Sequence, residues 1–453
     1  MKLSPSRAFV ASLLFTLSVS CATTGPKGVV VEPLFKAPIA PPESTHAPSV
    51  SKPEHEAPIA SQTKFYRLMI KNEPATSIVI GYSLPSGSTL RTKLFYDVKD
   101  YGADVIKYSK VAEPTATNEF KSLNNIFVEL SGLRADTVYY FVVSDGKGLS
   151  PRFSFRTTPA VSTAKLSVIA GGDSRSNQIP RQLANLLVPK LRPHFVMFAG
   201  DMTTLGSDEQ WAQWFEDWQL TIARDGRMTG VLFTRGNHES SNEILEKLFY
   251  TSSGVYYAVS FANDLLRVYT LNSEMPAAGA QTEWLKGDLA KHESIKYKFA
   301  QYHRPIRPHT SGKSDNSGGY TYWAPLFHKF KVDLVSEADA HTVKYTWPIR
   351  PSTSAGSQEG FVRDDAAGTV YIGEGCWGAP LRANDDIRKW TRDTARFNSF
   401  HWIFVDSRQT EVRTVKVDNA QKVGELTDKN RFTKPANLDV WVPSNGEVIT
   451  IKP

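Results

Sequence analysis

One apolar stretch of the chain ends abruptly in polar side chains, at residues 231–239 (Val-Leu-Phe-Thr-Arg-Gly-Asn-His-Glu). The short apolar run with β-branched residues predicts a buried strand. A glycine follows it, and Asn237 and His238 then stand at its carboxyl end. In open α/β sheets, ligands bind in the crevice outside the carboxyl ends of the strands. The stretch therefore favours an α/β fold with a polar site at one edge of a sheet.

Four other predicted strands end in the same way. Apolar runs precede polar residues at 166–170 before Asp173, 194–199 before Asp201, 298–302 before His303, and 331–336 before Asp339 and His341. Helical patterns at residues 179–191, 210–220 and 282–292 separate these runs, and strands return at 369–374 and 400–417. The alternation predicts an α/β sandwich with polar residues at its strand ends.

The polar residues at these strand ends form a set that suits metal ions. Any one of them alone would more often be a helix cap or a hydrogen-bonded core group. Together they offer carboxylates, imidazoles and an amide carbonyl, which are the ligands that two divalent ions about 3.5–4 Å apart require.

The N-terminus (residues 1–21) has the pattern of a targeting segment. Lys2 and Arg7 flank an apolar run at residues 8–19, which is too short to span a bilayer as a mature helix. The run ends in Leu-Ser-Val-Ser before Cys21 and resembles a bacterial lipoprotein signal, although Ser18 stands where leucine is commonest. The resemblance implies a lipidated Cys21 that anchors the chain to a membrane of the cell envelope, on the outer-membrane or periplasmic side. Plain secretion is the alternative.

Residues 22–62 are rich in Pro, Ala, Ser and Glu and predict an extended linker, because such a segment cannot bury enough apolar surface to fold. Cys376 is the only cysteine besides Cys21. If Cys21 carries lipid, no intrachain disulfide is possible, and Cys376 is expected to be a small buried apolar residue.

Residues 63–159 alternate short strands with turn residues, and about seven such strands predict an all-β sandwich. The segment 133–141, which begins with a leucine and carries Tyr139, resembles a fibronectin type III corner, in which a tyrosine hydroxyl anchors a strand crossing. No constellation of catalytic groups stands in this domain. A spacer or platform is its expected role.

The spaced motifs Gly-Asp, Gly-Asp, Gly-Asn-His-Glu, His and a final histidine, after a fibronectin-like domain, resemble a purple acid phosphatase. That family is a branch of the calcineurin-like metallophosphoesterases, and the resemblance extends from about Lys64 to the C-terminus. It implies a metallophosphoesterase β-sandwich flanked by helices over residues 160–453, and a phosphoester hydrolase of the acid phosphatase type with two metal ions per chain, iron with zinc or manganese.

The resemblance also assigns roles to residues. It implies that Asp173, Asp201 and His341 hold the first metal, and that Asp201, Asn237, His303 and Asp339 hold the second, with Asp201 bridging the two. A metal-bridging hydroxide would attack phosphorus in line. His238 would stabilise or protonate the leaving oxygen.

Two further residues are candidates for substrate contacts. Arg175 stands two residues past a ligand and could bind phosphate in a bidentate manner, with a plain surface arginine as the alternative. His309 could reach the substrate from the Gly-, Ser- and Asn-containing loop at residues 305–320.

Three positions depart from the family pattern. Thr204 stands where the family has a metal-binding tyrosine, and Asp339 stands where it has the first histidine of its last pair. Related phosphoesterases without the tyrosine carry a histidine at the position of Arg175. The first metal would keep three protein ligands. The family's tyrosine binds as a negatively charged phenolate, and Asp339 would restore the negative charge that is lost with it.

Composition and the predicted site together leave three hypotheses about function. The 53 Lys and Arg against 46 Asp and Glu give a formal charge of +7, which favours anionic substrates, but no clustered basic and aromatic residues point to nucleic acid. A phosphomonoesterase is the leading reading. The same site could serve a phosphodiesterase or nucleotidase, and a catalytically inert, surface-anchored binding protein is the alternative from another class.

Overall fold

The structure is a computed structural model that describes residue 50 and residues 59–453. The predicted signal peptide with Cys21, and the predicted linker up to residue 58 apart from residue 50, lie outside the described residues. Within the described part of the chain, no helix is both long enough and apolar enough to cross a bilayer.

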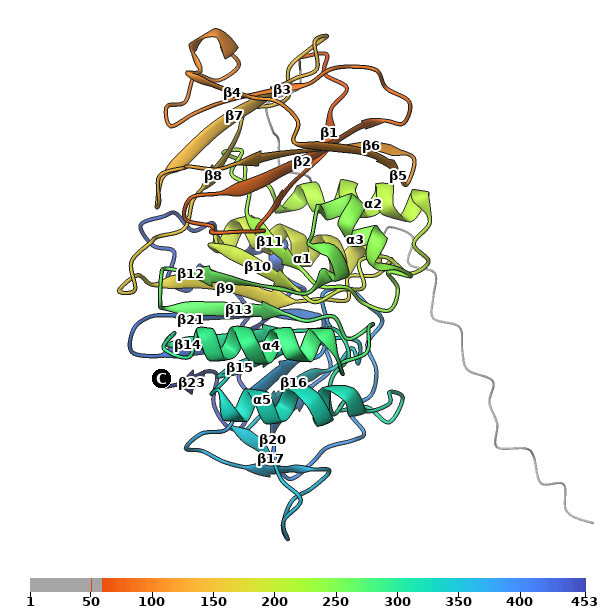
Figure 1. Cartoon of the computed structure of the whole chain (residues 1–453), viewed down its shortest axis with the longest axis vertical. Helices are drawn as coiled ribbons and strands as arrows, with labels where there is room; N and C mark the ends of the chain where they lie inside the picture. Colours follow the sequence, from red (N-terminus) through yellow and green to blue (C-terminus); the bar gives the residue numbers. More distant parts are fainter. Residues whose placement is uncertain (1–49, 51–58) are drawn as a thin grey trace, which may run out of the picture. The chain divides into compact units, whose positions relative to one another are not determined.

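The largest sheet has ten strands, with β23 at one edge and β5 at the other (Figure 1). In spatial order it contains β23 (Ile449–Ile451), β22 (Thr410–Lys416), β21 (Ser399–Val405), β9 (Leu166–Gly171), β10 (Phe195–Phe198), β11 (Gly230–Phe233), β1 (Lys64–Met69), β2 (Ile78–Pro85), β6 (Leu123–Leu130) and β5 (Ala116–Phe120). Strands β9, β10 and β11 are parallel neighbours in register.

Three smaller sheets accompany it. The seven-stranded sheet has the order β12 (Tyr257–Phe261), β13 (Leu266–Thr270), β14 (Tyr297–Gln301), β15 (Leu334–Ser336), β19 (Val370–Gly373), β16 (Val343–Thr346) and β20 (Thr391–Ala395). A four-stranded sheet contains β4 (Lys110–Ala112), β3 (Lys93–Asp97), β7 (Val138–Ser144) and β8 (Phe153–Arg156), and a two-stranded one contains β17 (Ile349–Pro351) and β18 (Phe361–Arg363).

The helices are few and short. The α-helices are α1 (Gln178–Leu191), α2 (Asp208–Trp218), α3 (Asn242–Phe249), α4 (Ala280–Lys291) and α5 (Ala324–Lys329). Single turns occur at η1 (Val105–Lys107), η2 (Gln219–Thr221), η3 (Ser253–Val255), the π-helical η4 (Gly319–Trp323) and η5 (Ala420–Lys422). Ser207 caps the start of α2, because its hydroxyl accepts a hydrogen bond from the backbone N–H of Gln210.

The two large sheets pack face to face, with helices on their outer faces. One core lies between the sheets, where the rings of Phe195 and Phe261 stack at 3.9 Å. A second core joins the other face of β9, β10 and β11 to α1, α2 and α3. A third joins the seven-stranded sheet to α4 and α5. The result is a mixed α/β sandwich, as the alternating pattern predicts.

Burial on both faces explains the sequences of the central strands. Every residue of β9, β10 and β11 is buried, which is typical of parallel strands covered on both sides. The predicted helices at residues 179–191, 210–220 and 282–292 are confirmed by α1, α2 and α4 within a few residues. Cys376 is buried and unpaired, as expected of a small apolar residue.

Four of the N-terminal strands, β1, β2, β5 and β6, join the central sheet, whereas β3, β4, β7 and β8 form the four-stranded sheet. Strand β1 pairs in parallel with β11, so that Leu68 lies opposite Gly230 and Met69 lies opposite Val231. The Tyr139 hydroxyl accepts a hydrogen bond from the backbone N–H of Arg134 at 2.8 Å, which matches the tyrosine-corner expectation. The assignment of residues 63–159 to a separate fibronectin type III-like domain stays a prediction.

Candidate metal centre

The predicted ligands follow the carboxyl ends of strands in both large sheets. Asp173, Asp201, Asn237, His303, Asp339 and His341 come after β9, β10, β11, β14 and β15. Neighbouring strands in each group run parallel, so their carboxyl ends meet at the same edge. Four of the residues have left-handed backbone, with φ of 58° at Asp173, 56° at Asp201, 64° at Asp339 and 57° at His341. Backbone strain of this kind clusters at functional sites.

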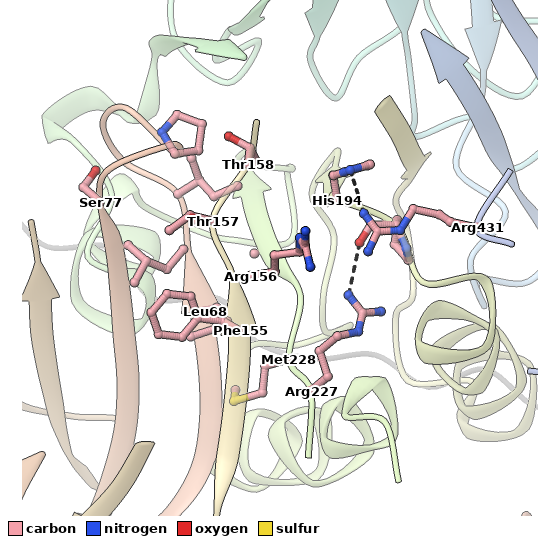
Figure 2. A pocket seen from close by; sticks show the side chains of 15 residues that line it. Leu68, Ser77, Phe155, Arg156, Thr157, Thr158, His194, Arg227, Met228 and Arg431 are labelled. Atoms are coloured by element: carbon pink, nitrogen blue, oxygen red, sulfur yellow. Dashed lines mark hydrogen bonds between the residues drawn. The ribbon is translucent and has the colours of Figure 1, made fainter. Parts of the chain in front are cut away.

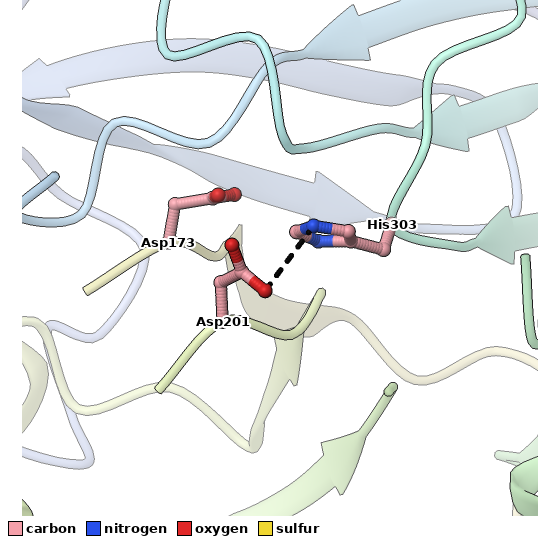
Figure 3. A group of neighbouring side chains, drawn as sticks. All are labelled: Asp173, Asp201 and His303. Atoms are coloured by element: carbon pink, nitrogen blue, oxygen red, sulfur yellow. Dashed lines mark ion pairs between the residues drawn. The ribbon is translucent and has the colours of Figure 1, made fainter. Parts of the chain in front are cut away.

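Asp173, Asp201 and His303 form the centre of the cluster (Figure 3). All three are buried, and one ligand atom from each lies within 4.8 Å of the others. His303 Nε2 is 3.3 Å from Asp201 Oδ1 and 3.1 Å from Asn237 Oδ1. A carboxylate, an amide oxygen and an imidazole thus converge on one point.

Asp339 and His341 complete the cluster from the other side. His341 Nε2 is 3.0 Å from Asp173 Oδ1, and Asp339 Oδ1 is 3.6 Å from His303 Nε2. The backbone N–H of Asp339 donates to Asp173 Oδ2 at 2.9 Å. The structure therefore brings all six predicted ligands together.

Backbone carbonyls orient both imidazole rings. His303 Nδ1 lies 2.8 Å from the carbonyl of Ala199, and His341 Nδ1 lies 2.8 Å from the carbonyl of Pro380. Because a carbonyl can only accept, each Nδ1 carries the hydrogen. In the neutral form of each ring, the lone pair of Nε2 then points at the carboxylates, which is the usual arrangement around a metal-ligating histidine.

The charges of the cluster are strongly coupled. Burial raises the pKa of Asp173. Burial also opposes ionisation of Asp201, but His303 and His238 outweigh it and lower the pKa of Asp201 to about 2. Although burial disfavours a charged imidazole, Asp201 and Asp173 raise the pKa of His303 well above its ordinary value. The carboxylates thus form a buried site that stabilises positive charge.

The donor set fits two divalent cations. Three carboxylates, two oriented imidazoles and one amide oxygen match the ligands that zinc, manganese and iron accept. Glycines allow the carboxylates to sit where they do. A Cβ at Gly375 would lie 1.9 Å from Asp173 Oδ2, and one at Gly236 would lie 2.3 Å from Asp201 Oδ1. Any side chain at these positions would displace a candidate ligand.

Glu239, the last residue of the Gly-Asn-His-Glu stretch, holds the loops that carry the ligands. Its fully buried carboxylate accepts the backbone N–H groups of Asp201 at 2.9 Å, Met202 at 2.9 Å and Gly236 at 2.8 Å. Burial, together with the nearby Asp201, raises the pKa of Glu239 to about 7. One side chain therefore fixes the turns after both β10 and β11.

We expect Glu239→Ala to weaken metal binding by about 10- to 100-fold, because the turns that present Asp201 and Asn237 lose their shared acceptor. Titration calorimetry with Zn²⁺ or Mn²⁺ measures the effect. Glu243→Ala removes a carboxylate that is 54% exposed and serves as the matched control. Equal affinities in the two variants would contradict the positioning role of Glu239.

Arg175, His238 and Thr204 line the rim of the cluster. Arg175 Nη1 lies 3.4 Å from Asp201 Oδ2, and its Nε lies 3.5 Å from Thr204 Oγ1. His238 Nδ1 is 2.5 Å from the Thr204 carbonyl, and its Nε2 is 3.8 Å from Asp201 Oδ2. Thr204, one of the positions that depart from the family pattern, thus contacts Arg175 and His238.

The sequence did not predict two basic residues that lie at the site. The Lys313 ammonium pairs with Asp339 Oδ1, and Arg382 Nη1 donates to the Asp339 carbonyl at 2.8 Å. Lys313 lies in the loop at residues 305–320, whose composition indicated a substrate loop, but a single lysine in a loop carries no signal. Arg382 lies in a segment without regular structure.

His309 lies away from the cluster. It is fully buried, its Nε2 is 2.7 Å from Thr391 Oγ1, and its ring packs edge-on against Trp390 at 5.6 Å. Burial lowers the pKa of His309 well below the ordinary value. Among the described residues, its contacts are with this interior and not with the candidate ligands. A loop pattern alone could not show that its histidine points inward.

Comparisons with known proteins agree with this geometry. The family model of calcineurin-like phosphoesterases matches residues 174–344. The uncharacterized protein Rv2577 of Mycobacterium tuberculosis (strain H37Rv) is 23% identical over 378 residues, which cover 69% of each chain.

Two solved structures show the same fold. The purple acid phosphatase PPD1 from yellow lupin (Lupinus luteus) seeds aligns with a TM-score of 0.67 and 15% identity, over 82% of this chain and 74% of the plant enzyme. The structure of PhoD aligns with a TM-score of 0.60 and 12% identity, over 86% of this chain and 92% of PhoD. Residues 174–344 therefore resemble the calcineurin-like phosphoesterases, within a fold that both solved structures share.

Proposed function

We propose that the protein is a phosphomonoesterase of the acid phosphatase type that uses two metal ions. The observation that carries the proposal is the convergence of six ligand-bearing residues from five strand ends on one buried cluster. The plant purple acid phosphatase with the same fold supports the subtype. The positive rim formed by Arg175, Lys313 and Arg382 suits an anionic substrate.

The contacts divide the ligands between two positions. Asp173 and His341 touch each other at 3.0 Å and would hold the first cation together with Asp201. Asn237 Oδ1 and Asp339 Oδ1 lie 3.1 Å and 3.6 Å from His303 Nε2, and these three residues would hold the second cation, again with Asp201. The pair would be iron with zinc or manganese.

The two cations, when bound, supply Lewis-acid polarisation of the phosphoryl group and an activated water. The chain itself supplies orientation and a proton. Arg175 is held between Asp201 and Thr204, so that its remaining N–H groups can donate to phosphoryl oxygens.

His238 is placed to serve the leaving oxygen. The Thr204 carbonyl takes the Nδ1 hydrogen, and Nε2 is left on the side of the ring that faces Asp201. A proton held at Nε2 would pass to the oxygen of the departing alcohol as its bond to phosphorus breaks. The ring is about a quarter exposed, so a substrate can reach it.

Hydrolysis of p-nitrophenyl phosphate and bis(p-nitrophenyl) phosphate by the metal-replenished full chain tests the proposal. We expect faster turnover of the monoester, and a loss of about 10²-fold or more in Asn237→Ala, which removes a ligand of the second position. Faster turnover of the diester would favour a phosphodiesterase. Absence of turnover of both esters with every metal would contradict the proposal that the protein is an enzyme.

The cellular location is part of the proposal. A lipid on Cys21 would anchor the chain to a membrane of the cell envelope, and residues 22–62 would hold the catalytic domain away from it. Support comes from the sequence pattern at residues 1–21.

One contact favours the alternative of an inert binding protein. The Lys313 ammonium pairs with the same Asp339 oxygen that faces His303, so Lys313 and a second cation would compete for one carboxylate. A chain in which Lys313 prevails would bind one metal at Asp173, Asp201 and His341.

A further inference from the structure

A second polar site lies at the opposite edge of the central sheet. A small hollow, partly open to solvent, is lined by residues from β1, β2 and β8 and from the segments before β10 and β11, together with Arg431. His194 precedes β10, and Arg227 precedes β11. The hollow therefore lies at the amino ends of these strands, whereas Asp201 and Asn237 follow their carboxyl ends. We call it the arginine hollow, after Arg156, Arg227 and Arg431.

The guanidinium group of Arg227 is buried without a counter-ion. The residue is 6% exposed, and Nη1 makes one long hydrogen bond, 3.4 Å, to the Pro193 carbonyl. Its Nε and Nη2 are buried and have no hydrogen-bond partner. In the described part of the chain, no carboxylate lies within 4.0 Å of this group. Burial lowers the pKa of Arg227 to about 9, as expected of a cation without a partner.

Arg431 and His194 present a second set of unsatisfied donors. His194 Nδ1 faces the backbone N–H of Ser167 at 2.9 Å, and its Nε2 faces Arg431 Nη1 at 2.6 Å. A neutral imidazole carries one hydrogen and so can accept from one of these donors only. Arg431 Nε is also buried without a partner. At least one more N–H group is therefore left without an acceptor.

The nearby carboxylates do not balance the charge. Asp428 is shared by Arg431 at 2.6 Å, Arg192 at 2.8 Å and Arg156 at 3.5 Å. Asp136 and Asp225, which pair with Arg156 and Arg192, are more than half exposed, so that solvent screens their charge. The hollow thus carries excess positive charge and excess donors, and buried donors without partners are rare in folded proteins.

We propose that the arginine hollow binds a free tetrahedral oxyanion, such as inorganic phosphate or sulfate. Figure 2 shows the side chains of Arg156, Arg227 and Arg431 gathered around it, with Thr158 at its margin. Planar guanidinium groups recognise oxyanions through paired N–H donors. The buried hydroxyl of Thr158 also lacks a partner and lines the same space. A bound anion would connect Arg156 of β8 with Arg227 and Arg431, and would stabilise the junction between the N-terminal strands and the catalytic part.

Thermal unfolding of the metal-loaded full chain in rising phosphate tests this site. We expect a saturable rise in Tm of roughly 3 °C or more with phosphate and with sulfate, and none with potassium chloride at equal ionic strength. Arg227→Met should lose that rise and should unfold at a higher temperature than the wild type in anion-free buffer, because it removes a buried unpaired charge. Arg224→Met, at a 74% exposed neighbour, is the matched control and should respond like the wild type.

Two outcomes would overturn the proposal. One is the same phosphate-dependent rise in Arg227→Met as in the wild type, which would assign the effect to the metal centre. The other is no rise in the wild type with any oxyanion. If glycerol phosphate raises Tm and inorganic phosphate does not, the oxyanion site stands and its occupant is a phospholipid headgroup.

A crystallographic measurement covers the case in which Arg227→Met fails to fold. Wild-type crystals soaked in selenate should show an anomalous peak within hydrogen-bond distance of the Arg227 and Arg431 guanidinium groups. A selenate peak at the metal centre alone would contradict the proposal.

Discussion

Asp201→Asn is expected to lower kcat/KM for p-nitrophenyl phosphate on the order of 10³-fold or more. Asp201 Oδ1 lies 3.3 Å from His303 Nε2 and accepts the backbone N–H of His238 at 2.9 Å, while Oδ2 lies 3.4 Å from Arg175. An asparagine removes the charge that the two proposed metal positions would share. It also turns an amide N–H₂ toward groups that are themselves donors.

Steady-state kinetics together with metal analysis of the purified variant measures this effect. Asp365→Asn removes a surface carboxylate that is 62% exposed and, among residues 59–453, pairs only with Arg363, so it serves as the control for the loss of one negative charge. Retention of full activity in Asp201→Asn would contradict a bridging role for this carboxylate. A loss of activity with normal metal content would show that Asp201 acts on the substrate side instead.

Lys344→Met is expected to destabilise the folded protein by about 3–5 kcal/mol, because it leaves two buried carboxylates without a cation. The Lys344 ammonium is 1% exposed, lies 2.5 Å from Glu337 Oε2 and also pairs with Glu374 Oε1. Burial disfavours the charged amine, but Glu337 and Glu374 together raise the pKa of Lys344.

The buried triad of Lys344, Glu337 and Glu374 also supports the metal centre. The backbone carbonyl of Glu374 accepts the N–H of His341, and Glu337 accepts the Tyr302 hydroxyl at 2.7 Å, next to His303. We therefore expect Lys344→Met also to weaken metal binding.

Urea denaturation measures the change in the free energy of unfolding. Lys247→Met breaks a surface pair with Glu243 in which both side chains are at least 40% exposed, and it should cost at most about 0.5 kcal/mol. The double variant Lys344→Met with Glu374→Gln should recover part of the loss, since one buried charge is removed with its partner. Equal stabilities of Lys344→Met and Lys247→Met would rule out the proposed role of the buried triad.

The sequence predicts the ligand set because the determinants are local. An apolar run forms a strand, and the glycine after it ends the strand. The next polar side chain therefore lies at the edge of the sheet, as at Asp201 and Asn237. Parallel neighbours then bring these ends together without any information beyond strand order.

The parts that the sequence did not predict depend on contacts between distant segments. The pairing of β1 with β11 joins residues about 160 positions apart. The ammonium of Lys313 reaches Asp339 across a loop, and His309 turns inward to Thr391. From the sequence, Lys344 is only a polar residue in a strand. Its position between two carboxylates depends on the folded chain.

The number of metal ions bound per chain tests the central claim most directly. After saturation with Zn²⁺ or Mn²⁺ and removal of free metal by gel filtration, inductively coupled plasma mass spectrometry should find two equivalents per wild-type chain. Asp201→Asn should retain fewer. A wild-type chain that binds one equivalent or none would contradict the two-metal hydrolase and favour a binding protein in which Lys313 keeps Asp339.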